Sequence, residues 1–244
     1  MNTLSKLIFI LCVLLLTVTP KLLPAQGTGA GDVSDVATHM HEHLSKITEI
    51  KTQIIMGDLA GVDEPATWLA EHESVTGLPD SFAPYVELMR NYAHQVVAAE
   101  DLDSAAVAVS DMARTCGNCH LVNEISVGFD DDRMPADWSD ITTHMQRHQW
   151  AADRLWEGLI GPSDLAWNQG TDMLVDVPLR PTDMVDEWTA TADFVAIDEI
   201  ARRVHLLGGR GTNTRTPDAR GKLYGEMLGL CADCHSMLKR GPGR

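Results

Sequence analysis

The sequence is poor in basic residues. Its 244 residues include 19 Lys and Arg against 35 Asp and Glu, which gives a formal net charge of −16 at pH 7. A surface that binds nucleic acid needs clustered Lys and Arg, so this balance excludes nucleic acid as a partner. The excess of negative charge instead favours solubility and docking to protein partners with basic surfaces.

Long apolar runs are confined to the first 25 residues. Lys6 precedes the apolar stretch Leu7–Val18, and small Ala25 precedes a polar, Gly-rich segment that begins at Gln26. This layout is typical of a secretory signal peptide, so we expect residues 1–25 to be removed and the product to lie in the periplasm. An uncleaved membrane anchor is the alternative. Cleavage would remove two lysines and change the formal charge from −16 to −18.

Cysteine is scarce as well, and its placement is informative. Four cysteines remain after the predicted cleavage, and both pairs read CxxCH: Cys116-Gly117-Asn118-Cys119-His120 and Cys231-Ala232-Asp233-Cys234-His235. In this motif the two thiols can form thioethers with the vinyl groups of one haem, and the adjacent histidine reaches the iron. We therefore predict two covalent c-type haems, with His120 and His235 as the proximal iron ligands.

Three other uses of CxxC compete with haem attachment. A zinc site requires the two pairs to lie much closer together in the sequence than they do here. A thioredoxin-like site requires a strand followed by a helix, which the sequence does not indicate. Two short disulfides are usual in an exported protein, but they do not explain the two histidines that follow.

An internal repeat divides the chain into two halves. Thr38–His43 matches Thr143–His148 at an offset of 105 residues, whereas the two CxxCH motifs are offset by 115. We predict one domain over residues 30–127 and a second over 136–244, joined by an acidic linker at 128–135. The Gly-rich stretch Gly208–Thr216 is the expected place for some of the extra residues.

Each half shows a helical period. Apolar residues recur at alternating steps of three and four, which predicts an amphipathic first helix in each half. The two matching seams are Val33, Val36, Met40, His43, Ile47, Ile50 and Ile54, and Trp138, Ile141, Met145, His148, Ala152, Leu155 and Leu159. Further helices are expected over 63–73, 79–100 and a segment after Asp101 or Asp103, and over 163–177, 181–207 and the segment that contains Tyr224 and His235. We predict an all-α protein of two tandem four-helix bundles, each with CxxCH near the end of its last helix.

The seams also contain candidate sixth ligands for the two irons. A histidine within an apolar seam is costly unless its nitrogens are satisfied, and His43 and His148 occupy the same seam position in both halves. We predict that they are the distal ligands, with Met40 and Met145 as the alternative and a core histidine bonded to a carbonyl as the other interpretation. The remaining histidines are assigned as pocket neighbours (His39, His144), rival ligands (His94, His205) or surface residues (His41, His72).

A four-helix bundle with CxxCH near the end of its last helix resembles the cytochrome c′ class and its low-spin relatives. The resemblance covers most of each half, in tandem. In those families the residue on the distal side of the iron comes from the first helix, where Met40 and His43 lie. A basic residue often follows the motif about four positions after its histidine: Lys239 fits this pattern, whereas Glu124 does not.

These observations predict a periplasmic dihaem c-type cytochrome that transfers electrons and is not an enzyme. Its partners would be redox proteins with basic docking surfaces, and a homodimer is left open. The alternative is a five-coordinate haem protein that binds nitric oxide or carbon monoxide in the manner of cytochrome c′. A dihaem peroxidase fits less well, because such enzymes resemble larger chains with a different cytochrome fold.

Overall fold

The computed structural model describes residues 33–74, 78–129, 134–135, 140–175 and 194–238. Within these ranges the chain forms eight α-helices and two short 3-10 helices and no β-strand, so the prediction of an all-α fold is confirmed. Apolar residues that recur every three to four positions favour this outcome over strands, which require strict alternation. None of the described helices is long and apolar enough to cross a membrane.

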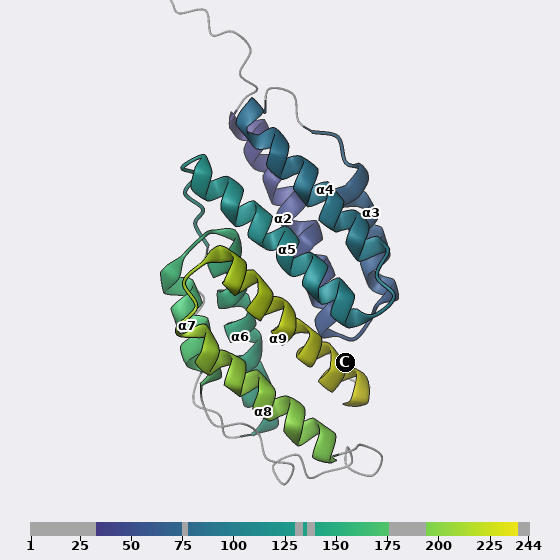
Figure 1. The fold of residues 1–244 in the computed structure, drawn as a ribbon, viewed down its shortest axis with the longest axis vertical. Helices are drawn as coiled ribbons and strands as arrows, with labels where there is room; N and C mark the ends of the chain where they lie inside the picture. Colours follow the sequence, from purple (N-terminus) through teal and green to yellow (C-terminus); the bar gives the residue numbers. More distant parts are fainter. Residues whose placement is uncertain (1–32, 75–77, 130–133, 136–139, 176–193, 239–244) are drawn as a thin grey trace, which may run out of the picture. The chain divides into compact units, whose positions relative to one another are not determined.

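The first four helices pack in chain order. They are α2 (Val33–Ile55), α3 (Asp63–Glu71), α4 (Ala83–Val97) and α5 (Leu102–Val122), with 3-10 turns η1 (Ala60–Val62) and η2 (Asp80–Phe82) before α3 and α4. Helix α2 contacts α3, α3 contacts α4, α4 contacts α5, and α5 returns to α2 (Figure 1). The helix expected over 79–100 is shorter than predicted, because its first residues form the 3-10 turn.

The last four helices repeat this order. They are α6 (Ile141–Ile160), α7 (Asp164–Leu174), α8 (Phe194–Gly211) and α9 (Pro217–Leu238), and each contacts the next while α9 returns to α6. The predicted helix over 163–177 begins as expected, because the Ser163 side chain caps α7. Its last two residues and the first part of the predicted 181–207 helix lie outside the described residues.

The Gly-rich stretch that was expected to hold some of the extra residues is partly helical. Gly208–Gly211 form the last turn of α8 and are not a loop. Gly208 and Gly211 pack closely against α7, at Leu174 and Thr171. The segment between Val175 and Phe194 lies outside the described residues, so the place of the extra residues stays a prediction.

The predicted seams face the core. In α2, Ile47, Ile50 and Ile54 are buried, and in α6 so are Leu155 and Leu159. Side-chain caps set where two of the helices begin: Asp101 accepts a hydrogen bond from Ser104 N at 2.7 Å, and Asp140 accepts one from Thr143 N at 2.9 Å. These caps satisfy amide groups that would otherwise have no partner in the first turn.

A stripe of glycines brings the two halves together. Helices α5 and α9 make the most extensive interhelical contact among the described elements. Gly221, Gly225 and Gly229 of α9 lie along this contact, and a Cβ at Gly225 would stand 3.2 Å from Val107 Cα. Ser110 donates a buried hydrogen bond of 2.5 Å to the Gly221 carbonyl. Small residues at the crossing therefore allow the backbones to approach closely.

Polar contacts join the first helices of the two halves. Lys51 of α2 is buried and pairs with Asp153 of α6 at 2.5 Å, and its ammonium lies over the Trp156 ring. Trp156 donates to Thr48 at 3.3 Å. The described helices of both halves fall in one compact unit with one buried core.

Candidate functional site

Both CxxCH motifs lie in the last turns of a helix. Cys116–His120 belong to α5, which ends at Val122, and Cys231–His235 belong to α9, which ends at Leu238. No disulfide joins the four thiols in the described part of the chain. Burial raises the pKa of Cys116 and of Cys231 to about 12, so both sulfurs are held as thiols. A redox-active or metal-binding CxxC requires the opposite shift, toward the thiolate.

The motif histidines are oriented by backbone carbonyls. His120 Nδ1 donates to the Ile160 carbonyl at 2.8 Å, and His235 Nδ1 donates to the Ile55 carbonyl at 2.5 Å. A carbonyl can only accept, so Nδ1 carries a proton, and in the neutral imidazole this tautomer has its lone pair on Nε2. Histidine ligands to metals are commonly held in this way, because the second hydrogen bond fixes the tautomer and the ring orientation.

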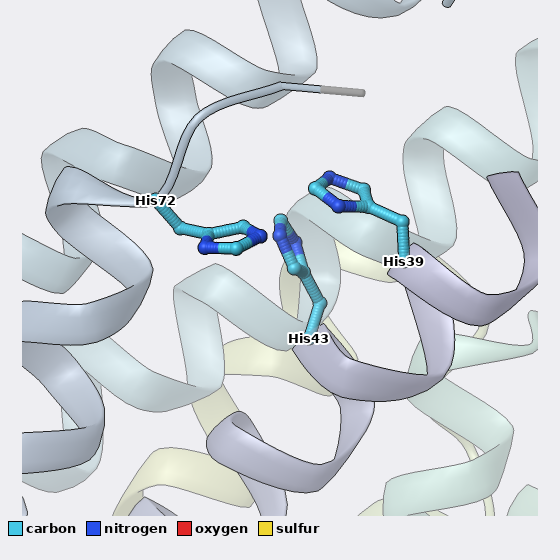
Figure 2. A group of neighbouring side chains, drawn as sticks. All are labelled: His39, His43 and His72. Atoms are coloured by element: carbon cyan, nitrogen blue, oxygen red, sulfur yellow. The ribbon is translucent and has the colours of Figure 1, made fainter. Parts of the chain in front are cut away.

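Three histidines meet in the first half. His39 and His43 lie one turn apart on α2, and His72 lies directly after α3, with all three rings gathered in one place (Figure 2). The ring centroids are 4.3 Å apart for His39 and His43 and 5.0 Å apart for His39 and His72. Each residue offers one nitrogen within 4.8 Å of the others. We call this set the first histidine triad.

His43 is the most strongly perturbed member of the first triad. Burial, followed by the neighbouring His39 and His72, lowers its pKa from the ordinary value of 6.5 to about 3. The imidazole is therefore neutral at any physiological pH. Its Nε2 is buried and has no hydrogen-bond partner among the described residues. A buried imidazole nitrogen without a partner is unfavourable, and the neutral imidazole is the form that binds metals, so Nε2 is a suitable candidate ligand.

A second triad repeats this arrangement. His144 and His148 of α6 meet His205 of α8, again with one nitrogen each within 4.8 Å of the others. Ring centroids are 4.5 Å apart for His144 and His148 and 5.0 Å apart for His148 and His205. His205 Nδ1 donates to the Leu174 carbonyl at 2.8 Å, so its Nε2 carries the lone pair.

His148 matches His43 in its environment. Burial, then the nearby His144, His205 and His235, lowers its pKa well below 6.5. Its Nε2 is also buried without a hydrogen-bond partner among the described residues. The electrostatic influence of His235 indicates that the histidine of the second motif lies in the neighbourhood of the second triad.

The order of the helices explains this neighbourhood. In the first half, successive helices are joined by short connections and run antiparallel in turn, so α2 and α5 also run antiparallel. These two helices contact each other. The start of α2, with His43, therefore lies toward the end of α5, with His120. In the second half, α6 contacts α9, and the influence of His235 on the pKa of His148 indicates that these two residues lie near each other.

The structure revises the roles predicted for several histidines. His39 and His144, expected beside the seam, are buried members of the two triads. His41 and His94 are exposed and belong to neither triad. His72 is not a surface residue: it is half-buried in the first triad and stacks on Trp68 with centroids 3.8 Å apart. The spacing of four residues between Trp68 and His72 was the one feature of the sequence that could have indicated this contact. His205, expected as a rival ligand, belongs to the second triad.

The structure gives less evidence about the two methionines that are the alternative distal ligands. Met40 and Met145 lie one turn before His43 and one turn before His148, and both are half-buried. Neither is part of the fully buried core.

Compared with known proteins, the chain matches no protein-family model, no curated protein and no solved structure.

Proposed function

We propose that the chain is a dihaem c-type cytochrome that transfers electrons in the periplasm. Cys116 and Cys119 would hold one haem, and Cys231 and Cys234 the other. His120 and His235 would be the proximal iron ligands, and His43 and His148 the sixth ligands. The four helices α2–α5 and the four helices α6–α9 would form the two bundles that enclose these sites.

The observation that carries the proposal is that each half contains two histidines whose environments suit Nε2 to binding iron. His120 and His235 both donate Nδ1–H to a carbonyl, which leaves Nε2 for iron. His43 and His148 both hold a buried Nε2 that has no hydrogen-bond partner within the described ranges. Two imidazoles facing one iron give a low-spin haem with no open position, and such a haem suits electron transfer.

This pattern favours six-coordinate over five-coordinate haem. Binding of nitric oxide or carbon monoxide requires an empty distal position lined by groups that do not ligate the iron. Low pKa values keep His43 and His148 neutral, so their nitrogens compete for iron at any physiological pH. The haem would supply the electron chemistry, while these residues bind the iron and exclude water and other small ligands.

Optical and EPR spectra of the ferric protein, matured by the c-type assembly machinery, test this proposal. Bis-imidazole ligation predicts low-spin signals from both haems and no weak thioether-to-iron charge-transfer band. A high-spin signal from both haems would support the gas-binding alternative. A thioether band would assign the sixth position to Met40 and Met145 instead.

A second candidate function is favoured by the triads alone. Three imidazole nitrogens within 4.8 Å of one another can bind a divalent transition metal such as Zn²⁺ or Cu²⁺ without haem. The hydrogen bond from His205 to the Leu174 carbonyl would orient the imidazole for such a metal as well. Elemental analysis separates the two candidates. The cytochrome requires iron equal to haem and no other metal, whereas a metal-binding protein requires zinc or copper in the same amount as triads.

A further inference from the structure

The two hydrogen bonds that orient the motif histidines both cross between the halves. His120 belongs to the first half, and its carbonyl partner Ile160 belongs to the second. His235 belongs to the second half, and its partner Ile55 belongs to the first. Ile55 and Ile160 are the last residues of α2 and α6 and are separated by 105 residues, the same offset as the first-helix repeat. The two contacts are therefore counterparts of each other.

The carbonyls of Ile55 and Ile160 can accept these hydrogen bonds because they lie at the ends of helices. The last carbonyls of an α-helix have no partner within the helix, so a donor from elsewhere can bind them. After α2 the chain turns through Gly57, whose φ of +74° favours glycine, and a Cβ there would stand 2.4 Å from Ser236 Oγ. After α6, Gly161 follows Ile160 directly, and a Cβ there would stand 2.6 Å from the Phe129 ring. Each helix end thus leaves a carbonyl that accepts a hydrogen bond from the motif histidine of the other half.

We propose that each proximal histidine is positioned by the first helix of the opposite half, so that neither haem site is complete within its own half. This proposal rests on the proposed dihaem function. Helix α2 would then carry the sixth ligand of the first haem, His43, and the carbonyl that orients the proximal ligand of the second. Helix α6 would have the reciprocal roles, with His148 and Ile160.

The packing around these contacts holds the two halves in register. The close α5–α9 crossing places the two motif helices against each other, and Gly117, within the first motif, approaches Leu159 so closely that a Cβ would lie 2.1 Å from its carbonyl oxygen. The ion pair between Lys51 and Asp153 ties α2 to α6. A shift of one helix end would therefore reach the histidine of the opposite half.

The hydrogen bond has an electronic consequence. An Nδ1–H that donates to a carbonyl makes the imidazole a more basic ligand, and a more basic ligand stabilises ferric iron. Weakening the bond should raise the midpoint potential of that haem and leave the other haem nearly unchanged. Ile55 and Ile160 are positioning residues in this account, because their carbonyls act on the iron through His235 and His120.

The test is Gly57→Ala in the full dihaem protein. This substitution strains the positive-φ position and pushes against Ser236, next to His235. The expected result is an upward shift in the potential of the second haem alone, on the order of tenfold in its redox equilibrium, or about 59 mV for one electron. Gly61→Ala is the matched control, because its Cβ would meet the ends of the Gln53 and Asp58 side chains and nothing of the second motif.

The two haems are distinguished by NMR of their methyl resonances, with those of the second haem identified as the ones that change in His148→Ala. A shift of the first haem as large as that of the second, or no shift of either, would overturn the proposal. Gly117→Ala is the reciprocal variant, because its Cβ would stand 2.1 Å from the Leu159 carbonyl oxygen, next to Ile160. It should shift the first haem, so the test survives if Gly57→Ala does not fold. A protein without two haems would instead contradict the proposed function.

Discussion

At the scale of single residues, the main feature of the chain is the free-energy cost of burying the side chains of His43 and His148. His43 and His148 each bury an Nε2 that finds no partner in the part of the chain that the structure describes, and their low pKa values exclude compensation by protonation. Such a cost is usually explained by a ligand that the side chain binds. The same feature recurs at the same repeat position, and the proposed iron ligation by both histidines would account for it.

Replacing His148 separates the two candidate ligands of the second iron. His148→Ala should convert one of the two haems to the high-spin state and open it to carbon monoxide, because the sixth position loses its imidazole. Met145→Leu is the control: it should leave the spin state unchanged and cost about 1 kcal/mol of packing at most. EPR of the ferric variants and carbon monoxide difference spectra of the ferrous variants measure both effects. If the two variants exchange these results, the methionine is the ligand.

The sequence predicted the seam histidines but not their whole environment. His43 and His148 were accessible because the repeat placed them twice within an apolar period. His72 was missed because it follows the end of α3 and has no counterpart in the second half. The orienting carbonyls of Ile55 and Ile160 could not be predicted, because every residue type has a backbone carbonyl and the sequence does not indicate which one accepts a hydrogen bond.

At the scale of helices, the close crossing of α5 and α9 depends on glycine. Gly225→Leu should destabilise the fold by about 1–3 kcal/mol, because a side chain there would overlap Val107 and Ser110. Gly209→Leu is the matched control, since a Cβ at Gly209 meets nothing within 4 Å. Chemical denaturation of both variants gives the comparison. Equal stability of the two variants would show that the crossing tolerates bulk and that the glycine stripe is incidental.

Helix positions were largely predictable, because apolar periodicity and side-chain caps are local signals. Asp101 and Ser163 mark the starts of α5 and α7 as expected. The partners of each helix were not predictable in the same way. The extensive α5–α9 contact depends on Gly221, Gly225 and Gly229, and glycine in a helix pattern also predicts a weak or broken helix.

At the scale of the whole molecule, one ion pair links α2 with α6 and is unequally buried. Lys51 is buried, whereas Asp153 is half-exposed. Asp153→Ala should therefore cost about 1.5–3 kcal/mol, because it leaves a buried ammonium without its charged partner. Lys51→Met should cost less, because Asp153 can be solvated. Denaturation midpoints of the two single variants decide this, and a larger loss for Lys51→Met would contradict the argument.

The acidic balance of the chain governs its encounters with partners. A formal charge of −16 should attract a basic redox protein and accelerate association at low ionic strength. Stopped-flow electron transfer to a cationic partner should therefore slow steeply as salt rises, with an acidic partner of similar potential as the control. An equal response to salt for both partners would remove the electrostatic contribution.

The most direct test of the central claim is the number of haems per chain. Both CxxCH motifs lie in the last turns of a helix, their four thiols form no disulfide among the described residues, and both motif histidines donate through Nδ1. Intact-mass analysis under denaturing conditions, on protein matured by the c-type assembly machinery, should therefore give the mass of the chain plus two covalently attached haems. Replacing Cys231 and Cys234 by Ala should reduce this to one haem. A mass without haem, or with haem retained at the second motif after that replacement, would contradict the account.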